Sequence, residues 1–327
     1  MRFIVYGVGA IGGTLATALA LSRQPVVGIA RGPHLTAIRE RGLLLRTPEA
    51  TRRARFPCVA DPADIGFLAD DAILLTVKSQ DTVAALEGLR AAGVRDQPIF
   101  CVQNGVSNER CALRCFPEVH GVTVRMPAAI TAPGEVAAFS VPRLGICDIG
   151  RYPDGINEHD HALARALEAG GIAAFVQPDV MQSKYGKLLH NLHNVVEATL
   201  GADAPGKRFD ALLRAEAEAV LTAAGIAWRE VGASDPLRDQ LMRYRSIDGV
   251  EHSGGSTTQS LARGAGSVET DYLNGEIVLL GRLHGVPVPV NAFFLDLGTR
   301  MARERLKPGA VTLADVEAGL AASATIR

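Results

Sequence analysis

The stretch GVGAIGG, residues 7–13, directly follows the apolar run RFIVY at residues 2–6, and the two segments together decide the fold. RFIVY has the composition of a buried strand, and the Ala- and Leu-rich segment 11–21 has that of a helix. The glycines between them form the pattern GxGxxG. Between a first strand and a helix, this pattern is typical of a turn that holds a dinucleotide.

Each glycine of the pattern has its own expected use. Gly7 permits the tight turn, Gly9 lets a pyrophosphate approach the backbone, and Gly12 lets the helix pack on the strand. The N-terminus of the helix adds unpaired N–H groups and its positive dipole end. A glycine-rich turn without a ligand is the alternative. The cofactor-binding residues predicted in this loop are Gly7, Val8, Gly9, Ala10, Ile11 and Gly12.

The residue after the second expected strand indicates which dinucleotide binds. Sites that prefer NAD place an Asp or Glu here, about 20 residues after the glycines, to accept a hydrogen bond from the ribose 2′-OH. In this chain the charged residue at that point is Arg31. A guanidinium can hold a 2′-phosphate through two parallel hydrogen bonds. Arg31 therefore predicts NADP(H), and a solvated surface arginine is the alternative.

Strand and helix patterns alternate through the first half of the chain. Further strands are expected at 25–30, 72–77, 98–102 and 172–176, and further helices at 34–42, 80–93 and 159–171. This alternation predicts an α/β Rossmann-type doubly wound sheet of mostly parallel strands. Residues 120–150 alternate around the turn Pro133–Gly134, and we expect them to form antiparallel edge strands on the same sheet.

From about residue 179 the pattern becomes helical throughout. The helix-length amphipathic segments are 182–200, 208–225, 235–246, 269–285 and a final helix near 291–305. We therefore predict two domains, a NADP-binding Rossmann domain at 1–178 and an all-helical C-terminal domain, for substrate and catalysis, at 179–327. The helical domain carries enough apolar surface for a homodimer.

Composition limits the partners that this chain can have. Its 327 residues carry a formal net charge of -1, so no global basic field recruits nucleic acid or an anionic membrane. The longest apolar runs are of strand length, and the N-terminus begins directly with a strand-like segment, which leaves no room for a signal peptide. The five cysteines are scattered and have no metal-binding spacing. We expect a cytoplasmic protein with reduced thiols and a small-molecule substrate.

The polar face of segment 182–200 differs in composition from the solvent-exposed face of an ordinary helix. Projected at 100° per residue, its leucines and valines occupy one arc, whereas Lys187, Asn191 and Asn194 line the other. Asn is a poor helix former, so two of them beside one lysine suggest a face that holds a polar ligand. A solvent-exposed face is the alternative. His190, His193 and Glu197 form the adjacent stripe, but one helix rarely provides a whole metal site, so we expect no metal.

Two further polar groups follow in the helical half. The stretch SGGSTTQS at 253–260 is expected to be flexible and rich in hydroxyl groups. Glu269 is expected to open a helix whose buried stripe is Leu273, Ile277 and Leu280. A carboxylate in a first helical turn is favoured by the helix dipole, so capping is the alternative to a functional role.

Together, several segments resemble the ketopantoate reductase (2-dehydropantoate 2-reductase) family along the whole chain. They are GVGAIGG, Arg31, TVKSQ with Lys78, QNGV with Asn104, KLLHN with Lys187 and Asn191, the serine of STTQ, and ETDYLNGEIVLLGRLHGVPVPVN. The resemblance implies a Rossmann domain, a helical C-terminal domain and NADPH as hydride donor. It also implies a 2-keto acid, best guessed as ketopantoate in pantothenate biosynthesis, bound in a cleft between the domains.

The resemblance also implies roles for individual residues. Lys187 would be the general acid that protonates the ketone oxygen, and Glu269 would orient that lysine and the substrate hydroxyl. Lys78, expected at the carboxyl end of a strand, would lie at the junction of cofactor and substrate. The residues implied for substrate binding are Asn104, Asn191 and Ser256, of which Asn104 would also contact the cofactor. Asn194, predicted from the polar face of segment 182–200, is expected to bind the substrate with them.

The chain departs from the family pattern around the substrate. Val195 replaces a second asparagine, and His190 and His193 replace apolar residues. One additional residue separates Gln259 from Glu269. A related reductase for another 2-keto acid or an imine is therefore one alternative, and an NADP(H)-binding regulatory protein without turnover is another.

Overall fold

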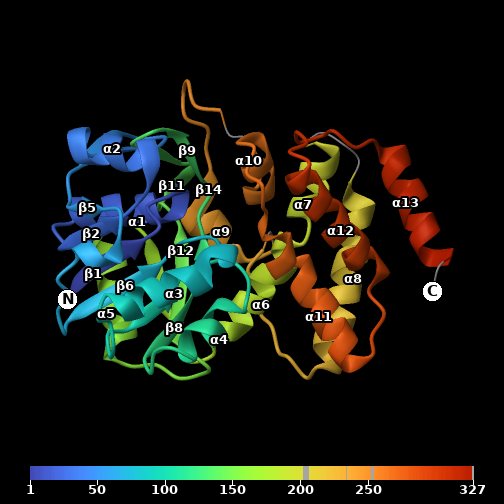
Figure 1. Cartoon of the computed structure of the whole chain (residues 1–327), viewed down its shortest axis with the longest axis horizontal. Helices are drawn as coiled ribbons and strands as arrows, with labels where there is room; N and C mark the ends of the chain where they lie inside the picture. The colour runs from blue at the N-terminus through green and yellow to red at the C-terminus, as the bar shows by residue number, and fades with distance from the viewer. Residues whose placement is uncertain (202–205, 233, 252–253, 326–327) are drawn as a thin grey trace. The chain divides into compact units, whose positions relative to one another are not determined.

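The computed structural model describes residues 1–201, 206–232, 234–251 and 254–325 (Figure 1). The chain divides into two compact units. The first comprises Met1–Lys184 and Glu230–His252, and the second comprises Tyr185–Arg229 and Ser253–Arg327. The predicted domains 1–178 and 179–327 are continuous in sequence, whereas these units are not.

An eight-stranded sheet forms the centre of the first unit, in the order β13-β12-β8-β7-β6-β1-β2-β5. Neighbouring strands in this sheet run parallel, except that β12 is antiparallel to β8. This confirms the predicted doubly wound α/β sheet. The strands are β1 (Arg2–Tyr6), β2 (Val26–Ile29), β5 (Cys58–Val59), β6 (Asp71–Leu75), β7 (Ile99–Cys101), β8 (Val119–Arg125), β12 (Ile146–Arg151) and β13 (Ala173–Val176).

The strand order places a topological switch between β1 and β6. From β1 the chain proceeds outward to β2 on one side, and from β6 it proceeds outward through β7 and β8 on the other. In open α/β sheets, ligands bind outside the carboxyl ends of the strands at such a point. The site is therefore expected in the loops that follow these strands.

Helices cover both faces of this sheet. They are α1 (Ala10–Leu21), α2 (Gly32–Arg41), α3 (Thr82–Ala91), α4 (Asn108–Leu113) and α5 (Glu158–Ala169). Because side chains alternate across a strand, β1 contributes to two cores. Phe3 belongs to the core that includes Leu15 of α1, and Ile4 belongs to the core that includes Leu86 of α3. Burial on both faces explains why the central strands read as continuous apolar runs.

A second sheet contains the hairpin predicted for the edge of the main sheet. β9 (Ala128–Ala132) and β10 (Glu135–Ala138) pair antiparallel and join β3 (Leu43–Arg46) and β4 (Thr51–Ala54) in a four-stranded sheet. The prediction of a single sheet is therefore wrong for these strands, although it is confirmed for β12. The reason is packing, because Val136 lies in the core beneath α1, where a Cβ on Gly13 would be 3.0 Å from it.

The segment 230–252 belongs to the first unit, although the residues before it (185–229) and after it (253–327) belong to the second. α9 (Pro236–Leu241) confirms only part of the helix predicted at 235–246, because β14 (Met242–Tyr244) pairs with β11 (Ser140–Pro142) as a strand. Arg125, buried in β8, donates to both carboxylate oxygens of Asp148 at 3.1 Å and to Asp235 at the start of α9. This buried ion pair ties segment 230–252 to the main sheet.

The second unit is helical in the described ranges. Its helices are the end of α6 (Val180–Asn191), α7 (Asn194–Leu200), α8 (Lys207–Ala223), α10 (Ser256–Ala262), the 3-10 turn η3 (Glu269–Tyr272), α11 (Asn274–His284), α12 (Pro289–Arg303) and α13 (Leu313–Thr325). Within those ranges, no helix combines the length and apolarity needed to cross a bilayer.

We expect Arg125→Met to lower the free energy of unfolding by about 3–5 kcal/mol, because two carboxylates are left beside an apolar group in a buried place. Urea unfolding measures the loss. Arg143→Met is the matched control, since Arg143 and Glu168 form an exposed pair at 3.1 Å. Such pairs contribute about 0–1 kcal/mol. Equal losses in the two variants would show that the Arg125 pair does not hold segment 230–252.

Candidate active site

The glycine loop after β1 leaves space at one of its three glycines. Gly7 has a φ of +106°, and a Cβ on it would lie 2.8 Å from the backbone nitrogen of Val77. A Cβ on Gly12 would lie 2.3 Å from the carbonyl oxygen of Gly7. A Cβ on Gly9 would meet no protein atom closer than 3.8 Å. Gly7 and Gly12 are thus required by the protein itself, whereas Gly9 keeps the backbone open to a ligand.

The start of α1 fits a pyrophosphate. Gly9 is the N-cap residue of α1 and has no side chain with which to cap the helix. The first N–H groups of an α-helix have no partner within the helix, so those of Ala10, Ile11 and Gly12 can bind an anion. Thr76 donates from Oγ1 to the carbonyl oxygens of Tyr6 and Gly7, both at 2.9 Å, and holds the loop in place.

Arg31 lies at the carboxyl end of β2, beside the end of β1. It is exposed and is the N-cap residue of α2. Burial raises the pKa of the Tyr6 hydroxyl, and Arg31 opposes this through its charge and a side-chain hydrogen bond. The edge of the sheet next to the glycine loop thus presents a cation rather than the acid that NAD sites use.

Lys78 and Asn104 lie in the loops that follow the adjacent strands β6 and β7. Lys78 is half-buried and precedes the 3-10 turn η2 (Ser79–Asp81). Ser79 donates from Oγ to the carbonyl oxygen of Asn104 at 3.3 Å, and Asn108 donates from Nδ2 to the same oxygen at 3.0 Å. The Ser79 bond ties the two loops to each other, and the Asn108 bond holds the Asn104 loop to the start of α4.

A buried ion pair that the sequence interpretation missed supports the Asn104 loop. Lys184 of α6 donates from Nζ to the carbonyl oxygens of Cys101 at 3.2 Å and Gln103 at 3.0 Å, and to the carboxylate of Glu109. Lys184 is 2% exposed and Glu109 is fully buried. Burial raises the pKa of Glu109, and the charge of Lys184 opposes this rise. The sequence signal was a lysine four residues before Leu188, on the apolar arc of the helix.

The helix that carries Lys187 ends earlier than predicted. α6 ends at Asn191 and α7 begins at Asn194, so the single helical face predicted for Lys187, Asn191 and Asn194 is wrong beyond Asn191. Asn274 of α11 donates from Nδ2 to the carbonyl oxygen of Leu192 at 3.3 Å, in the break between the two helices. This bond gives a partner to a backbone group that a helix end leaves without one.

Ser256 and Glu269 open short helical elements in the second unit. Ser256 begins α10, so the predicted flexible stretch is helical from that residue on, and Ser253 lies outside the described residues. Glu269 is 5% exposed and begins η3, not α11, which starts at Asn274. The predicted stripe Leu273, Ile277 and Leu280 is buried.

Two polar atoms of the predicted substrate site are buried without a partner. They are Nδ2 of Asn191 and Oγ of Ser256, neither of which makes a hydrogen bond to the described residues. Buried polar atoms are almost always hydrogen-bonded, and the exceptions need an explanation. A bound ligand with acceptor and donor groups provides one.

The predicted site residues divide cleanly between the units. Residues 7–12, Arg31, Lys78 and Asn104 belong to the first unit. The predicted catalytic and other substrate-binding residues, namely Lys187, Asn191, Asn194, Ser256 and Glu269, belong to the second.

The two histidines and the glutamate of the histidine stripe have separate surroundings in the described part of the chain. The rings of His190 and His193 have centroids 5.4 Å apart. Glu197 instead accepts hydrogen bonds from the N–H of Gly255 and the hydroxyl of Thr258. Among the described residues, no group of three or more His, Cys, Asp or Glu side chains is arranged to hold a metal ion.

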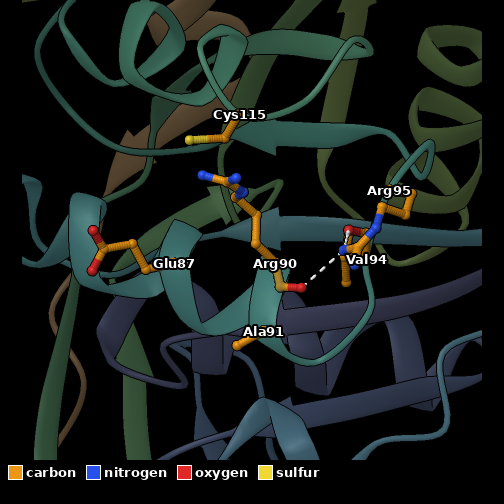
Figure 2. A pocket seen from close by; sticks show the side chains of 6 residues that line it. All are labelled: Glu87, Arg90, Ala91, Val94, Arg95 and Cys115. Carbon is orange, nitrogen blue, oxygen red and sulfur yellow. Dashed lines mark hydrogen bonds between the residues drawn. The ribbon is translucent and has the colours of Figure 1, made fainter.

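A pocket elsewhere on the first unit takes no part in this site. Figure 2 shows the side chains that line it, namely Glu87, Arg90, Ala91, Val94, Arg95 and Cys115. Arg95 donates from Nη1 to the carbonyl oxygens of Arg90 at 2.8 Å and Val94 at 2.7 Å, so this guanidinium is held by the backbone. No predicted site residue lines the pocket.

Two family models match the chain, one for each half. Residues 3–153 match the model described as ketopantoate reductase PanE/ApbA, and residues 179–301 match that of its C-terminal part. A 2-dehydropantoate 2-reductase of Halobacterium salinarum is 30% identical over 91% of this chain and 97% of its own length. That of Pyrococcus horikoshii is 28% identical over 94% of this chain and 99% of its own length.

Solved structures share the fold over nearly the whole chain. A PanE/ApbA family ketopantoate reductase from Ralstonia eutropha has a TM-score of 0.77 at 26% identity, over 93% of this chain and 99% of that one. A D-mandelate dehydrogenase solved with NADH and anilino(oxo)acetate has a TM-score of 0.77 at 22% identity, over 94% and 100%. The chain thus belongs to the ketopantoate reductase family. It is an oxidoreductase of the 2-keto acid reductase type.

Lys184→Met removes the cation from the buried carboxylate of Glu109. The pKa of Glu109, already raised by burial, then rises further, because Lys184 no longer lowers it. The unfolded-state pKa of a glutamate is about 4.3, and the folded-state pKa of Glu109 lies above it. The contribution of this group to stability is therefore full below about pH 4.3 and is lost as the pH rises through the folded-state pKa. We expect a loss of about 3–5 kcal/mol near pH 8 and a smaller loss near pH 5.

Urea unfolding at both pH values measures this difference. In the double variant Lys184→Met/Glu109→Gln the extra pH dependence should disappear, because no carboxyl group remains at that position. A loss in Lys184→Met that is the same at both pH values would contradict the assigned pair.

Proposed function

We propose that this protein reduces 2-dehydropantoate to pantoate with NADPH. One observation carries the proposal, namely that the chain matches the models of both family domains. The roles that the sequence resemblance implies for Arg31 and Lys187 fit it. The relatives named 2-dehydropantoate 2-reductase support the choice of substrate. We also propose a role in pantothenate biosynthesis and a cytoplasmic location.

The first unit would hold the cofactor along the carboxyl edge of its sheet. The N–H groups at the start of α1 would bind the pyrophosphate in the space beside Gly9, and Arg31 would bind the 2′-phosphate. Lys78 and Asn104, at the ends of the next strands, would complete the contacts. Bound there, the reduced nicotinamide supplies the hydride.

Lys187 would act as the general acid. Its ammonium group stabilises the negative charge that develops on the ketone oxygen and then donates a proton from Nζ to that oxygen. Glu269 is buried, and a buried carboxylate is costly unless a cation or hydrogen-bond donors compensate it. We assign Glu269 to the orientation of Lys187 and of the substrate hydroxyl.

The substrate would be held by Asn104, Asn191 and Ser256. The unpartnered Nδ2 of Asn191 and Oγ of Ser256 support this assignment, because a keto acid offers oxygen atoms to both. Asn194 faces the turn at Gly255, because a Cβ built on Gly255 would lie 3.2 Å from Oδ1 of Asn194. We therefore leave Asn194 out of the direct substrate contacts.

Another 2-keto acid is the second candidate substrate. Val195 replaces the second asparagine of the family pattern, and its side chain is buried, where a Cβ on Gly298 would be 2.8 Å from it. One polar contact expected of the family is therefore absent at Val195. A panel of 2-keto acids assayed with NADPH and with NADH, followed by cofactor absorbance, tests the choice. Tight NADPH binding without turnover of any keto acid would instead favour a regulatory protein.

Arg31→Ala should weaken NADPH binding by roughly 10- to 100-fold, the size of a lost hydrogen-bonded charge pair, and change NADH binding little. Fluorescence titration with the two cofactors measures the ratio. Arg52→Ala is the control, because Arg52 is an exposed arginine on β4 of the same unit. Equal weakening of both cofactors by Arg31→Ala would contradict the 2′-phosphate assignment.

Lys187→Ala should lower kcat by about 10²-fold or more, the usual contribution of a general acid. Cofactor affinity should stay within about twofold, because the proposed phosphate contacts are elsewhere. Lys207→Ala, at an exposed lysine that begins α8, controls for the loss of a positive charge in the same unit. Nearly unchanged turnover in Lys187→Ala would exclude the proposed role.

A further inference from the structure

Glu197 of α7 holds the turn that leads into α10. Its Oε1 accepts a hydrogen bond from the N–H of Gly255 at 2.8 Å and another from the hydroxyl of Thr258 at 3.1 Å. One bond thus reaches the residue before Ser256 and the other reaches the first turn of the helix that Ser256 begins. A single carboxylate oxygen fixes both sides of Ser256.

The turn is made of glycines that fit closely against α7. Gly254 has a φ of +76°, and a Cβ on it would lie 2.0 Å from Oε1 of Glu197. A Cβ on Gly255 would lie 3.2 Å from Oδ1 of Asn194. Larger residues would therefore push the turn off α7. The close approach exists because both positions are glycine.

Ser256 lies between the two groups that Glu197 binds, and its own hydroxyl has no partner among the described residues. Oγ of Ser256 is buried and makes no hydrogen bond to the described part of the chain. By contrast, the two groups that approach Glu197 are satisfied by it. The bonds of Glu197 therefore fix the backbone of Ser256 and leave its hydroxyl available.

We propose that Glu197 is a positioning residue that sets the Ser256 hydroxyl for the substrate. This inference rests on the proposed reduction of a 2-keto acid, in which Ser256 contacts the substrate. Glu197 acts as a hydrogen-bond acceptor, so its charge is dispensable and its oxygen is not.

Steady-state kinetics with the best keto acid of the panel test the proposal through KM and kcat. Glu197→Ala should raise KM by about five- to tenfold, as expected for one misplaced hydrogen bond, and leave NADPH affinity unchanged. Glu197→Gln keeps an acceptor oxygen and should leave KM within about twofold of wild type. A Glu197→Gln variant as impaired as Glu197→Ala would overturn the role of the oxygen.

A double-mutant cycle separates positioning from general structural support. If Glu197 acts through Ser256, Glu197→Ala should change KM by less than about twofold when it is added to Ser256→Ala. Full additivity of the two effects, or an unchanged KM in Ser256→Ala alone, overturns the proposal. Absence of turnover with every keto acid in the wild-type protein overturns the proposed function as well, so the two failures are distinguishable.

A pair of glycine variants keeps the test valid if Glu197→Ala does not fold. Gly254→Ala should raise KM, because its Cβ meets Glu197. Gly264→Ala is the matched control, since Gly264 has a similar φ of +70° and no atom within 4 Å of its Cβ position. Equal KM values in the two variants would overturn the proposal, because a Cβ at Gly254 meets Glu197 and its partner Thr258, whereas a Cβ at Gly264 meets neither.

Discussion

The buried ammonium group of Lys184 is the constraint on which the position of the Asn104 loop depends. A charge of this kind is tolerated in a protein interior only when a counter-charge and hydrogen bonds surround it. Here the carboxylate of Glu109 and the carbonyl oxygens of Cys101 and Gln103 do so. Satisfying Lys184 therefore fixes the backbone just before Asn104 and ties it to α4 through the side chain of Glu109. The same helix, α6, carries Lys187 one turn later.

The parallel sheet then collects residues that are far apart in the sequence. Gly7, Arg31, Lys78 and Asn104 follow β1, β2, β6 and β7, which are neighbours in the sheet. Parallel strands end at the same edge, so four local signals that are far apart in the sequence lie along one edge of the sheet. The bonds from Ser79 and Asn108 to the carbonyl oxygen of Asn104 add rigidity to an arrangement that the topology already provides.

This topology explains which features could be predicted from the sequence. Strands buried on both faces and amphipathic helices can be predicted from the local pattern of apolar residues, and the first turn can be predicted from its glycines. The strand β14 and the break at Leu192 cannot, because each depends on a distant partner. β14 exists because β11 pairs with it, and Asn274 supplies the bond that the break at Leu192 requires. The hairpin at 128–138 was assigned to the wrong sheet for the same reason, since the partner β3 lies about ninety residues earlier.

Some buried polar groups of this chain hold loops in place, and others are those that we propose to contact the substrate. Lys184 and Glu197 resemble functional residues in their chemistry, yet both use protein groups as their partners. Asn191 and Ser256 keep a buried polar atom without one among the described residues. Leaving such an atom unpaired costs about 1–3 kcal/mol, and we propose that the substrate restores these bonds at Asn191 and Ser256. A missing partner does not by itself mark a ligand contact, because Oε2 of Glu109 and Nε of Arg125 also have none in the described ranges, and both belong to buried ion pairs that hold the first unit together.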